Sequence, residues 1–463
     1  MAVAESAANP TLEDETHGRA WQAMRALRHP NYRLFFGGQL ISVIGTFLTN
    51  TAMGWLASTL TSDPHKKALF ISLVLFASQI PLFVIGPIGG VWVDRLNRRK
   101  LLVATQSLSM LQSFALAALS LSHHINMYWA VGLALVQGLI NAIDIPGRQA
   151  FVIEMVEDRQ DLGNAIALNS TMVHGARLIG PAAAGLLIHW VGMGYCFLFD
   201  GFSYLAVIAA LLAMNIKPIP PRPRKSVLHE LYEGLRYVAG FPPARELLLL
   251  MALFSLSGVP AVMVLMPLFG LHFGGVHRGD LVYGFLSAAS GFGALLGAIR
   301  LAMRRTVLGL GRVIAMSSIL YALAIAAFAT SQWLPLSLLI LPFAGWGMIT
   351  NFAAANTILQ TIVDDDKRGR VMSFLAMSFM GMTPFGVLMV GGLASHLSPL
   401  NPFIGAERTM LIMSGVCLLA SIRYWMNLAR IRQYVRPIYV SRGILPQIAT
   451  GLQIAGAPAP TET

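Results

Sequence analysis

The segment FISLVLFASQIPLFVIGPIGGVWVDRLNRRK, residues 70–100, decides the fold class of this chain. Residues 70–88 carry no charge, whereas the seven residues from Asp94 to Lys100 include one acid and four bases. An apolar run of ~20 residues is long enough to cross the ~30 Å hydrocarbon core of a bilayer as a helix. Clustered Lys and Arg at the end of such a run mark a loop that stays in the cytoplasm. The segment therefore indicates a membrane span followed by a cytoplasmic loop.

The composition of the whole chain also indicates a membrane protein. Of its 463 residues, 56% are hydrophobic and 12% are charged, and the charged share is about half that of an average soluble domain. Twelve apolar stretches are long enough to span a bilayer. They lie near residues 33–59, 68–93, 101–122, 127–146, 165–190, 194–214, 245–271, 281–303, 312–331, 333–357, 371–394 and 408–428. We predict an all-α membrane protein of twelve transmembrane helices.

The distribution of basic residues predicts the orientation of these spans. With the N-terminus inside, and with residues near the ends of spans counted with the adjoining loop, 28 of the 33 Lys and Arg residues fall in cytoplasmic segments, four fall in outer loops, and Arg177 alone lies deep within a span. This bias places both termini in the cytoplasm and accounts for the net charge of +12 without a nucleic-acid partner. Residues 1–18 are polar and acidic, so we expect no cleavable signal peptide. The protein should lie in the inner (plasma) membrane as a multi-pass protein.

Several function classes are excluded by missing motifs. Neither HExxH, nor the phosphate loop GxxxxGK[ST], nor GxSxG occurs, and no Cys/His spacing suits a metal. Both cysteines, Cys196 and Cys417, lie inside predicted spans, which argues against a disulfide framework. We therefore expect neither an enzyme, nor a cofactor, nor a metal site.

The chain is predicted to consist of two related halves. We expect a cytoplasmic N-terminal segment with an amphipathic helix (1–32), a first six-helix bundle (33–214), a cytoplasmic linker with a short surface helix (215–244), a second bundle (245–428) and a cytoplasmic tail (429–463). An offset of 207 residues relates Gly90 to Gly297, Gly138 to Gly345, Asp144 to Asn351 and Val156 to Val363. Parallel six-helix halves are a transporter architecture, with the substrate site between them near the bilayer midplane.

Two spans carry polar stripes at helical spacing. The first span has Gln39, Ser42, Thr46 and Asn50 on one face, and the fourth has Gln137, Asn141 and Asp144. Single small polar residues commonly bond neighbouring helices in membranes. Because these residues form continuous stripes, we favour a water-accessible cavity and name Gln39, Ser42, Thr46, Asn50, Gln137 and Asn141 as candidate substrate contacts.

Ionisable residues within spans are further candidates, because burial of charge in a bilayer is unfavourable. Arg177 lies close to the middle of the fifth span, with His174 one turn away, and Asp200 lies towards the outer end of the sixth. Arginine cannot deprotonate, so Arg177 needs a partner, water or an anion. A structural arginine bound to backbone carbonyls or to Asp200 is equally open. We name Arg177, His174 and Asp200 as candidates for proton coupling.

The fifth span also carries a motif for close helix packing. Its sequence GARLIGPAAAG places Gly175, Gly180 and Gly185 around Pro181. Small residues let helices approach closely, and a proline removes one backbone hydrogen bond and kinks the helix.

The loop after the second span resembles the signature loop of the major facilitator superfamily, G-x-L-a-D-R-x-G-R-[RK]-x-x-L. The matching residues are Gly90, Asp94, Arg95, Arg98, Arg99 and Leu102, whereas Trp92 and Asn97 depart from the pattern. Asn97 replaces a glycine and tolerates a left-handed backbone. A carboxylate such as Asp94 can accept hydrogen bonds from a helix N-terminus, and the resemblance implies that this helix is the eleventh span. We expect Arg95 or Arg98 to pair with Asp144. With Gly90 and Arg99, these residues would form a conformational latch.

Within this superfamily, the chain resembles the enterobactin-exporter-like branch of transmembrane secretion effectors, which includes drug efflux pumps. Residues 26–64, 145–170, 176–188 and 359–374 carry the resemblance, which covers about 25–428. The glycine–proline stretch of the fifth span is similar to the antiporter motif, which implies export in exchange for protons. Ala134 stands where many drug/proton antiporters have arginine in R-x-x-Q-G, although Gln137 and Gly138 are kept.

Together these features predict a monomeric, proton-coupled exporter of a small amphipathic compound such as a siderophore or an antibiotic. The expected partners are the small-molecule substrate, protons and the lipid bilayer. An importer of a nutrient or lipid-derived solute is one alternative, and a membrane scaffold or sensor without transport is another.

Overall fold

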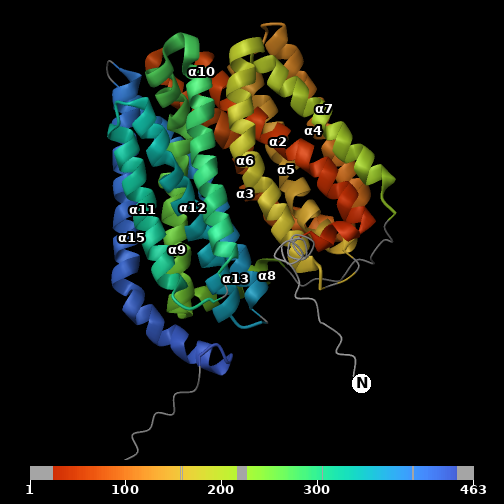
Figure 1. Cartoon of the computed structure of the whole chain (residues 1–463), viewed down its shortest axis with the longest axis vertical. Helices are drawn as coiled ribbons and strands as arrows, with labels where there is room; N and C mark the ends of the chain where they lie inside the picture. Colours follow the sequence, from red (N-terminus) through yellow and green to blue (C-terminus); the bar gives the residue numbers. More distant parts are fainter. Residues whose placement is uncertain are drawn as a thin grey trace, which may run out of the picture.

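The computed structural model describes residues 24–156, 158, 160–215, 227–304, 306–365, 367–398 and 401–445. Over these residues the protein is helical and contains no β-strand. The helices form two bundles side by side, red to yellow and green to blue in Figure 1. The all-α fold class predicted from the sequence is confirmed.

The N-terminal bundle contains six long helices. They are α2 (Pro30–Thr59), α3 (Lys67–Arg95), α4 (Arg98–Leu121), α5 (Met127–Met155), α6 (Leu162–Val191) and α7 (Met193–Ala213). Two short 3-10 turns, η1 (Arg25–Arg28) and η2 (Pro64–Lys66), precede α2 and α3. Helix α8 (Val227–Gly240) lies in the linker between the bundles, where the sequence predicts a short helix.

The C-terminal bundle is built from less regular helices. It contains α9 (Pro242–Leu256), α10 (Gly258–Ala302), α11 (Leu310–Thr330), α12 (Leu334–Ile362), α13 (Arg368–Ala376), the π-turn η3 (Met377–Gly381), α14 (Thr383–His396) and α15 (Pro402–Ser441). Helices α13, η3 and α14 together correspond to the predicted eleventh span.

Helix α10 folds back on itself as a hairpin, and its first arm continues the span that begins with α9. Gly275 has φ 62° and ψ −160° in the middle of α10, a conformation that glycine adopts readily. A Cβ on Gly270 would lie 2.6 Å from Tyr283 Cβ, whereas a straight helix would separate these residues by ~20 Å. The described residues hold eleven stretches long and apolar enough to span a bilayer, and 61-residue Pro242–Ala302 is one of them. Its reversal at Gly275 gives twelve crossings.

Two helices extend beyond their predicted ends. Helix α5 continues to Met155, past the expected end at residue 146, although Pro146 lies inside it. Helix α15 continues to Ser441, so part of the expected C-terminal tail is helical. Proline is tolerated within a membrane helix because neighbouring groups satisfy the freed backbone. A prediction from hydropathy finds only the apolar part of such helices, so the predicted ends fall short where the helix continues with polar residues.

The predicted internal repeat coincides with helix boundaries. Helices α5 and α12 each have 29 residues, and their first residues, Met127 and Leu334, differ by 207 positions, as do their last. Asp144 and the equivalent Asn351 are both buried, at 1% and 2% exposure. The same polar position therefore lies inside both bundles.

Helix starts follow the sequence closely. Asn97 has an extended backbone, φ −68° and ψ 108°, and its side chain accepts a hydrogen bond from the amide of Lys100 at the start of α4. Asparagine is among the best N-cap residues. Asn97 therefore does not adopt the left-handed backbone that asparagine tolerates: the residue that departs from the signature pattern caps a helix.

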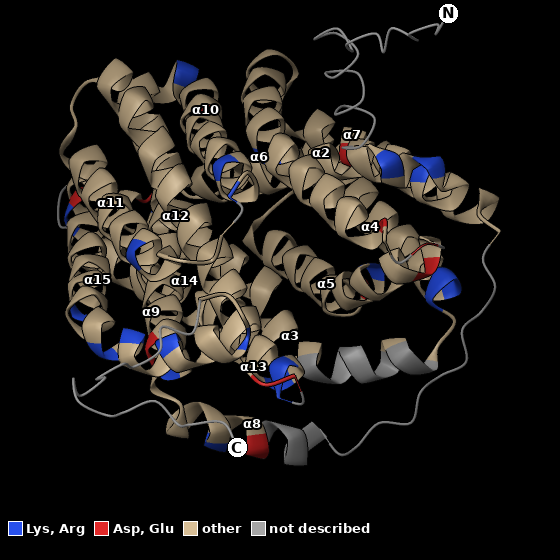
Figure 2. Cartoon of the chain, turned by 60° about the horizontal axis from the view of Figure 1, so that its bottom comes forward, with Lys and Arg blue, Asp and Glu red and all other residues tan. Residues whose placement is uncertain are grey.

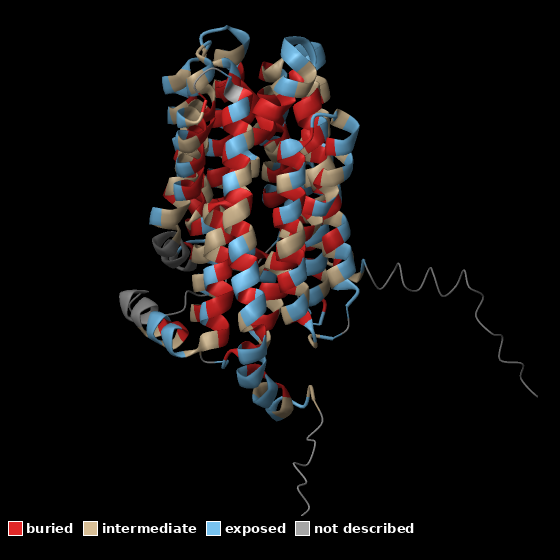
Figure 3. Cartoon of the chain, turned by 90° about the vertical axis from the view of Figure 1, so that its left-hand side faces the viewer, coloured by how far each residue is buried: buried red, intermediate tan, exposed pale blue. Residues whose placement is uncertain are grey.

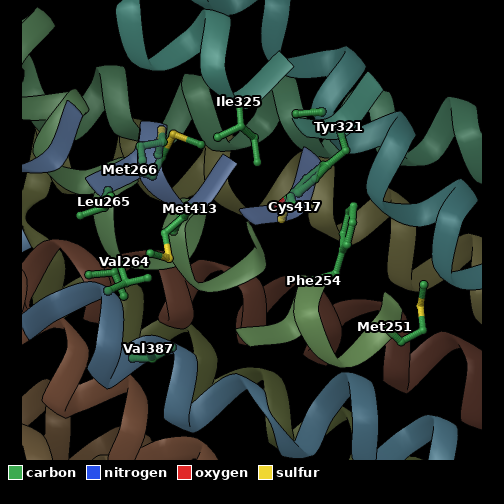
Figure 4. Close-up of a cluster of buried hydrophobic side chains, with 14 of the residues drawn as sticks. Met251, Phe254, Val264, Leu265, Met266, Tyr321, Ile325, Val387, Met413 and Cys417 are labelled. Carbon is green, nitrogen blue, oxygen red and sulfur yellow. The ribbon is translucent and has the colours of Figure 1, made fainter. Parts of the chain in front are cut away.

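Burial differs between the inner and outer surfaces of the bundles. Buried residues lie mainly in the interior and exposed ones on the outside (Figure 3). The C-terminal core contains Phe254, Met266, Tyr321, Met413 and Cys417 (Figure 4). Large apolar side chains cover the outside, for example Leu111, Leu339 and Leu419 at 59%, 67% and 69% exposure. A surface of this kind is suited to lipid contact.

The two ends of the molecule differ in charge and in contact between the bundles. We define the basic side as the end that carries Arg98–Lys100 and Lys367–Arg370. Lys and Arg residues, blue on the ribbon in Figure 2, gather around this end. On the opposite side the bundles touch: Ser395 donates a hydrogen bond to the carbonyl of His65, and His189 pairs with Asp280 at 3.4 Å. The rings of Trp55 and Tyr283 stack at 6.3 Å.

Candidate functional site

One face of α6 runs along the boundary between the bundles. Residues three or four apart lie on the same face of a helix. The face consists of Gly163, Ala167, Ser170, His174, Arg177, Pro181 and Gly185, and we call it the α6 stripe. Arg177 lies 15 residues from the start of α6 and 14 from its end, close to the middle of the membrane.

Beyond Arg177, away from the basic side, the α6 stripe packs against α10 of the other bundle. A Cβ on Gly284 would lie 2.7 Å from Gly185 Cα and 2.7 Å from the carbonyl oxygen of Pro181. A Cβ on Gly291 would lie 2.5 Å from the carbonyl oxygen of Arg177. Glycine is needed at these positions because the two backbones nearly touch. We call this contact the α6–α10 seam.

Towards the basic side the α6 stripe is uncovered. Gly163, Ala167 and Ser170 are exposed, whereas Gly185 and Pro181 on the same face are buried. On the basic side of Arg177, the residues of the α6 stripe therefore have no cover from the second bundle. His174 and Arg177 lie at the depth where the two bundles separate.

Arg177 has no carboxylate partner among the described residues. Its guanidinium carbon lies 5.8 Å from the centre of the Phe47 ring on α2, within the range of a cation–π contact. One turn away, His174 Nδ1 is buried without a hydrogen-bond partner. The expected alternative of a structural arginine bonded to Asp200 is not found in this structure, because the carboxylate of Asp200 bonds elsewhere.

Asp200 on α7 is enclosed by α2 and α4. It is 1% exposed, and its Oδ2 accepts a hydrogen bond of 2.9 Å from the Ser113 hydroxyl. The other oxygen, Oδ1, has no donor within bonding distance, although the Thr49 hydroxyl is near enough to interact with the carboxylate. A Cβ on Gly45 would lie 2.7 Å from Oδ1. This half-satisfied carboxylate can take up a proton.

A second buried carboxylate, Asp144 on α5, is fully bonded. Arg148 approaches Asp144 Oδ2 to 2.7 Å, and Thr105 and Gln106 donate hydrogen bonds of 2.6 and 2.9 Å to Oδ1. Arg148 also donates to Gln39 Oε1 at 3.1 Å. These contacts join α2, α4 and α5 within the N-terminal bundle.

Arg98, one of the two arginines expected to pair with Asp144, does not pair with it in this structure. Asp144 pairs with Arg148, and Arg98 forms an ion pair with Glu154 instead. Arg99 donates hydrogen bonds to the carbonyls of Leu211 and Leu212 at the end of α7. The burial of Gly90 and the side chains of Asp94 and Arg95 lie outside what the structure describes.

The two polar stripes are only partly exposed. On α2, Gln39 and Ser42 are 2% and 3% exposed, while Thr46 donates to the Ser42 carbonyl and Asn50 is exposed. On α5, Gln137 donates to Asn141 at 3.2 Å and to Ser109 at 3.3 Å. The basic-side end of the polar stripe on α2 is therefore buried against neighbouring helices, as expected if its residues bond other helices and do not line a cavity.

In the packing motif of α6, the glycines have different neighbours. A Cβ on Gly180 would lie 2.5 Å from Phe47 Cβ on α2, Gly185 faces α10, and Gly175 has open space around it. Pro181 is buried within the helix. Gly180 and Gly185 thus let α6 approach one helix of each bundle.

Several polar residues that bond in this bundle are not indicated by the sequence patterns. The predicted end of the fourth span at residue 146 places Arg148 and Glu154 in a loop, whereas both lie in α5. Thr105, Ser109, Gln112 and Ser113 recur at helical spacing on α4, which is a detectable signal. Asp161, before α6, accepts from Arg25, Arg28 and His29 at 2.7–3.1 Å. Burial alone would raise the pKa of Asp161, but hydrogen bonds from His29 and Arg28 and the charges of Arg25 and Arg28 hold it below the usual value.

The two-bundle fold is the one found in transporters of the major facilitator superfamily. Solved structures with this fold include a bacterial homolog of the human lysosomal transporter Spinster in an inward-facing, unoccupied conformation, with TM-score 0.66 and 15% identity over 88% of this chain and 98% of that chain. They also include a D-xylose–proton symporter, with TM-score 0.64 and 12% identity over 84% and 97% of the two chains.

Within that superfamily, the chain belongs to the transmembrane secretion effectors, whose family model matches residues 22–437. It is similar to the enterobactin exporter EntS of Escherichia coli O1:K1, with 24% identity over 405 residues, covering 88% of this chain and 94% of the relative. EntS of Escherichia coli O157:H7 is 24% identical over 415 residues, covering 90% and 96%. The predicted family is confirmed, and the protein is a membrane transporter and not an enzyme.

Proposed function

We propose that this transporter exports a small amphipathic compound across the inner membrane in exchange for protons that move inward. The basic side is the cytoplasmic side in this proposal, because Lys and Arg favour cytoplasmic loops. The observation that carries the proposal is the α6 stripe, which is packed against α10 beyond Arg177 and uncovered on the basic side. Substrate would enter from the cytoplasm and leave after the seam opens.

Relatives support the direction of transport. The similar proteins are named enterobactin exporters, so a siderophore-like amphipathic molecule is the first substrate to test. Folds alone do not decide direction, because a D-xylose–proton symporter shares this architecture. Export thus rests on the named relatives and on the access to the α6 stripe from the basic side.

Asp200 is the residue that we propose to carry the proton. It combines nearly complete burial with one carboxylate oxygen that lacks a donor. Protonation would remove the charge and supply an O–H group. Each proton that enters down the membrane potential releases ~2.3 kcal/mol per 100 mV, which can drive export of a neutral or singly charged compound.

The loop between α3 and α4 is proposed to latch the basic side when the bundles close there. Asp94 would then meet the N-terminus of α13, where partial positive charge favours a carboxylate. Arg98 and Arg99 already hold the loop to α5 and α7, so the loop is fixed to its own bundle. We propose Asp94 as the group that crosses to the other bundle.

Transport in everted membrane vesicles tests this proposal. Vesicles from a strain without its own efflux pumps are energised by respiration, and the uptake of enterobactin and erythromycin is measured. Export predicts accumulation inside everted vesicles, which collapses when nigericin dissipates the proton gradient. Gradient-dependent uptake only into right-side-out vesicles would show an importer. No gradient-dependent movement of any compound in a broad panel, with folded protein, would favour the scaffold or sensor.

A further inference from the structure

The guanidinium of Arg177 is a permanent charge in the middle of the membrane whose counter-charge the described part of the chain does not provide. The guanidinium carbon lies 5.8 Å from the centre of the Phe47 ring, and the side chain is half-buried. A charge in the middle of a bilayer is unfavourable unless a partner or water compensates it. A residue of this kind is expected only where something outside the chain neutralises it.

The position of Arg177 indicates that its counter-charge comes along the path of the substrate. The same helix face is packed against Gly284 and Gly291 on one side of Arg177 and exposed at Ser170 on the other. Arg177 thus lies at the inner end of the open part of the α6 stripe. A molecule that enters from the basic side reaches this guanidinium before the α6–α10 seam stops it.

The groups around Arg177 are suited to a ligand that has an anionic group attached to an apolar or aromatic part. His174, one turn towards the basic side, has a buried Nδ1 without a partner and lies near enough to Arg177 for their charges to interact. A planar guanidinium can bind both oxygens of a carboxylate or two adjacent phenolate oxygens. Phe47 offers an aromatic face beside it.

We propose that Arg177, with His174, binds an oxyanion on the transported compound, so that the substrate class is an amphipathic organic anion. This inference rests on the proposed export function and narrows it. It also separates two roles: Asp200 handles the proton, and Arg177, which does not titrate, holds the substrate. The anionic group neutralises Arg177 while the compound occupies the site.

A structural arginine makes the opposite prediction for stability. An arginine that bonds backbone carbonyls stabilises the fold, so its replacement lowers the melting temperature. A binding-site arginine without a partner strains the empty protein, so its removal leaves the melting temperature unchanged or raises it. Stability without ligand therefore distinguishes the two roles.

The test uses two probes of equal ring system and different charge, 1-naphthoate and 1-naphthamide. Binding to the purified full-length transporter in nanodiscs is measured by calorimetry and by the shift in melting temperature. We expect wild-type protein to bind naphthoate at least about 10-fold more tightly than naphthamide. Arg177→Gln should abolish this preference without lowering the melting temperature of the empty protein. Arg177→Lys should retain part of the preference.

Matched variants decide between the outcomes. Arg278→Gln, the same change at an exposed arginine on the opposite side, should keep the naphthoate preference. Equal affinity of wild-type protein for both probes, or a naphthoate preference that survives Arg177→Gln, overturns the inference. Stabilisation by dioctanoyl phosphatidic acid but not by naphthoate would assign the site to lipid and also overturn it. Export in everted vesicles is measured separately, so failure of the proposed function is seen independently of binding.

Discussion

Asp200 tests proton coupling at the scale of one residue. Asparagine keeps the size of the side chain and can still accept a hydrogen bond from Ser113, but it cannot bind a proton. We expect Asp200→Asn to reduce gradient-driven export at least about 10-fold, while exchange of labelled for unlabelled compound without a gradient persists. Vesicle assays of both modes measure this difference. Equal gradient-driven export by the variant would remove Asp200 from the coupling mechanism.

Gly45 tests the close contact between α2 and this carboxylate. A Cβ on Gly45 would lie 2.7 Å from both Asp200 Oδ1 and the Ser203 hydroxyl, so Gly45→Ala should destabilise the protein by ~1–3 kcal/mol. Gly37 on the same helix has open space around it, so Gly37→Ala should be neutral or stabilising by up to ~1 kcal/mol. Thermal melts in detergent compare the two. Equal shifts for both variants would contradict the packing at Gly45.

Residue roles were only partly accessible from the sequence. Arg177 and Asp200 stood out because charge within an apolar span is rare and unfavourable. Their partners could not be predicted, since pairing depends on which helices are neighbours in space. Asp144 illustrates this point: its arginine is Arg148 on its own helix, not Arg98 of the signature loop.

At the scale of helices, the α6–α10 seam is the element that should control access. A leucine at Gly284 would push against Gly185 and the Pro181 carbonyl, both of which are backbone and cannot move aside easily. Gly284→Leu should therefore prevent closure of this side and lower export at least about 10-fold. Flux in everted vesicles is the measurement.

A matched substitution checks whether the effect of Gly284→Leu arises from the seam. Gly392 on α14 is exposed and has open space around it, so Gly392→Leu should export normally. Normal export by Gly284→Leu, or equal loss in both variants, would contradict the role of the seam.

Element boundaries were predictable where hydropathy and caps agree. The repeat offset of 207 residues, found from a few matching letters, coincides with both ends of α5 and α12. The hairpin of α10 was expected as two spans, and its turn depends on Gly275. The π-turn η3 was not foreseen. It precedes Pro384, and the carbonyl of Phe379 within it accepts from Ser255 and Thr383. The hydrogen bond that Ser255 on α9 donates to this carbonyl is a tertiary contact that no local pattern reveals.

On the scale of the whole molecule, we interpret the structure as one of the two states that the proposed alternating-access cycle requires. The bundles touch on the side away from the basic loops, through α6 with α10 and α3 with α14. The number of spans and their pairing into halves followed from sequence. Which side of the molecule is closed could not be predicted from the sequence, because both proposed states use the same helices and differ only in which ends are in contact.

Distances between spin labels on the two bundles test this account most directly. In a background without Cys196 and Cys417, one pair labels Ala167 and Ile299 towards the basic side, and the other labels Ser122 and Trp333 on the opposite side, all exposed positions. We predict that acidification together with a transported compound shifts the population so that the first distance shortens as the second lengthens. Two distances that stay fixed, or that change in the same direction, in protein that still transports would contradict alternating access about the α6–α10 seam.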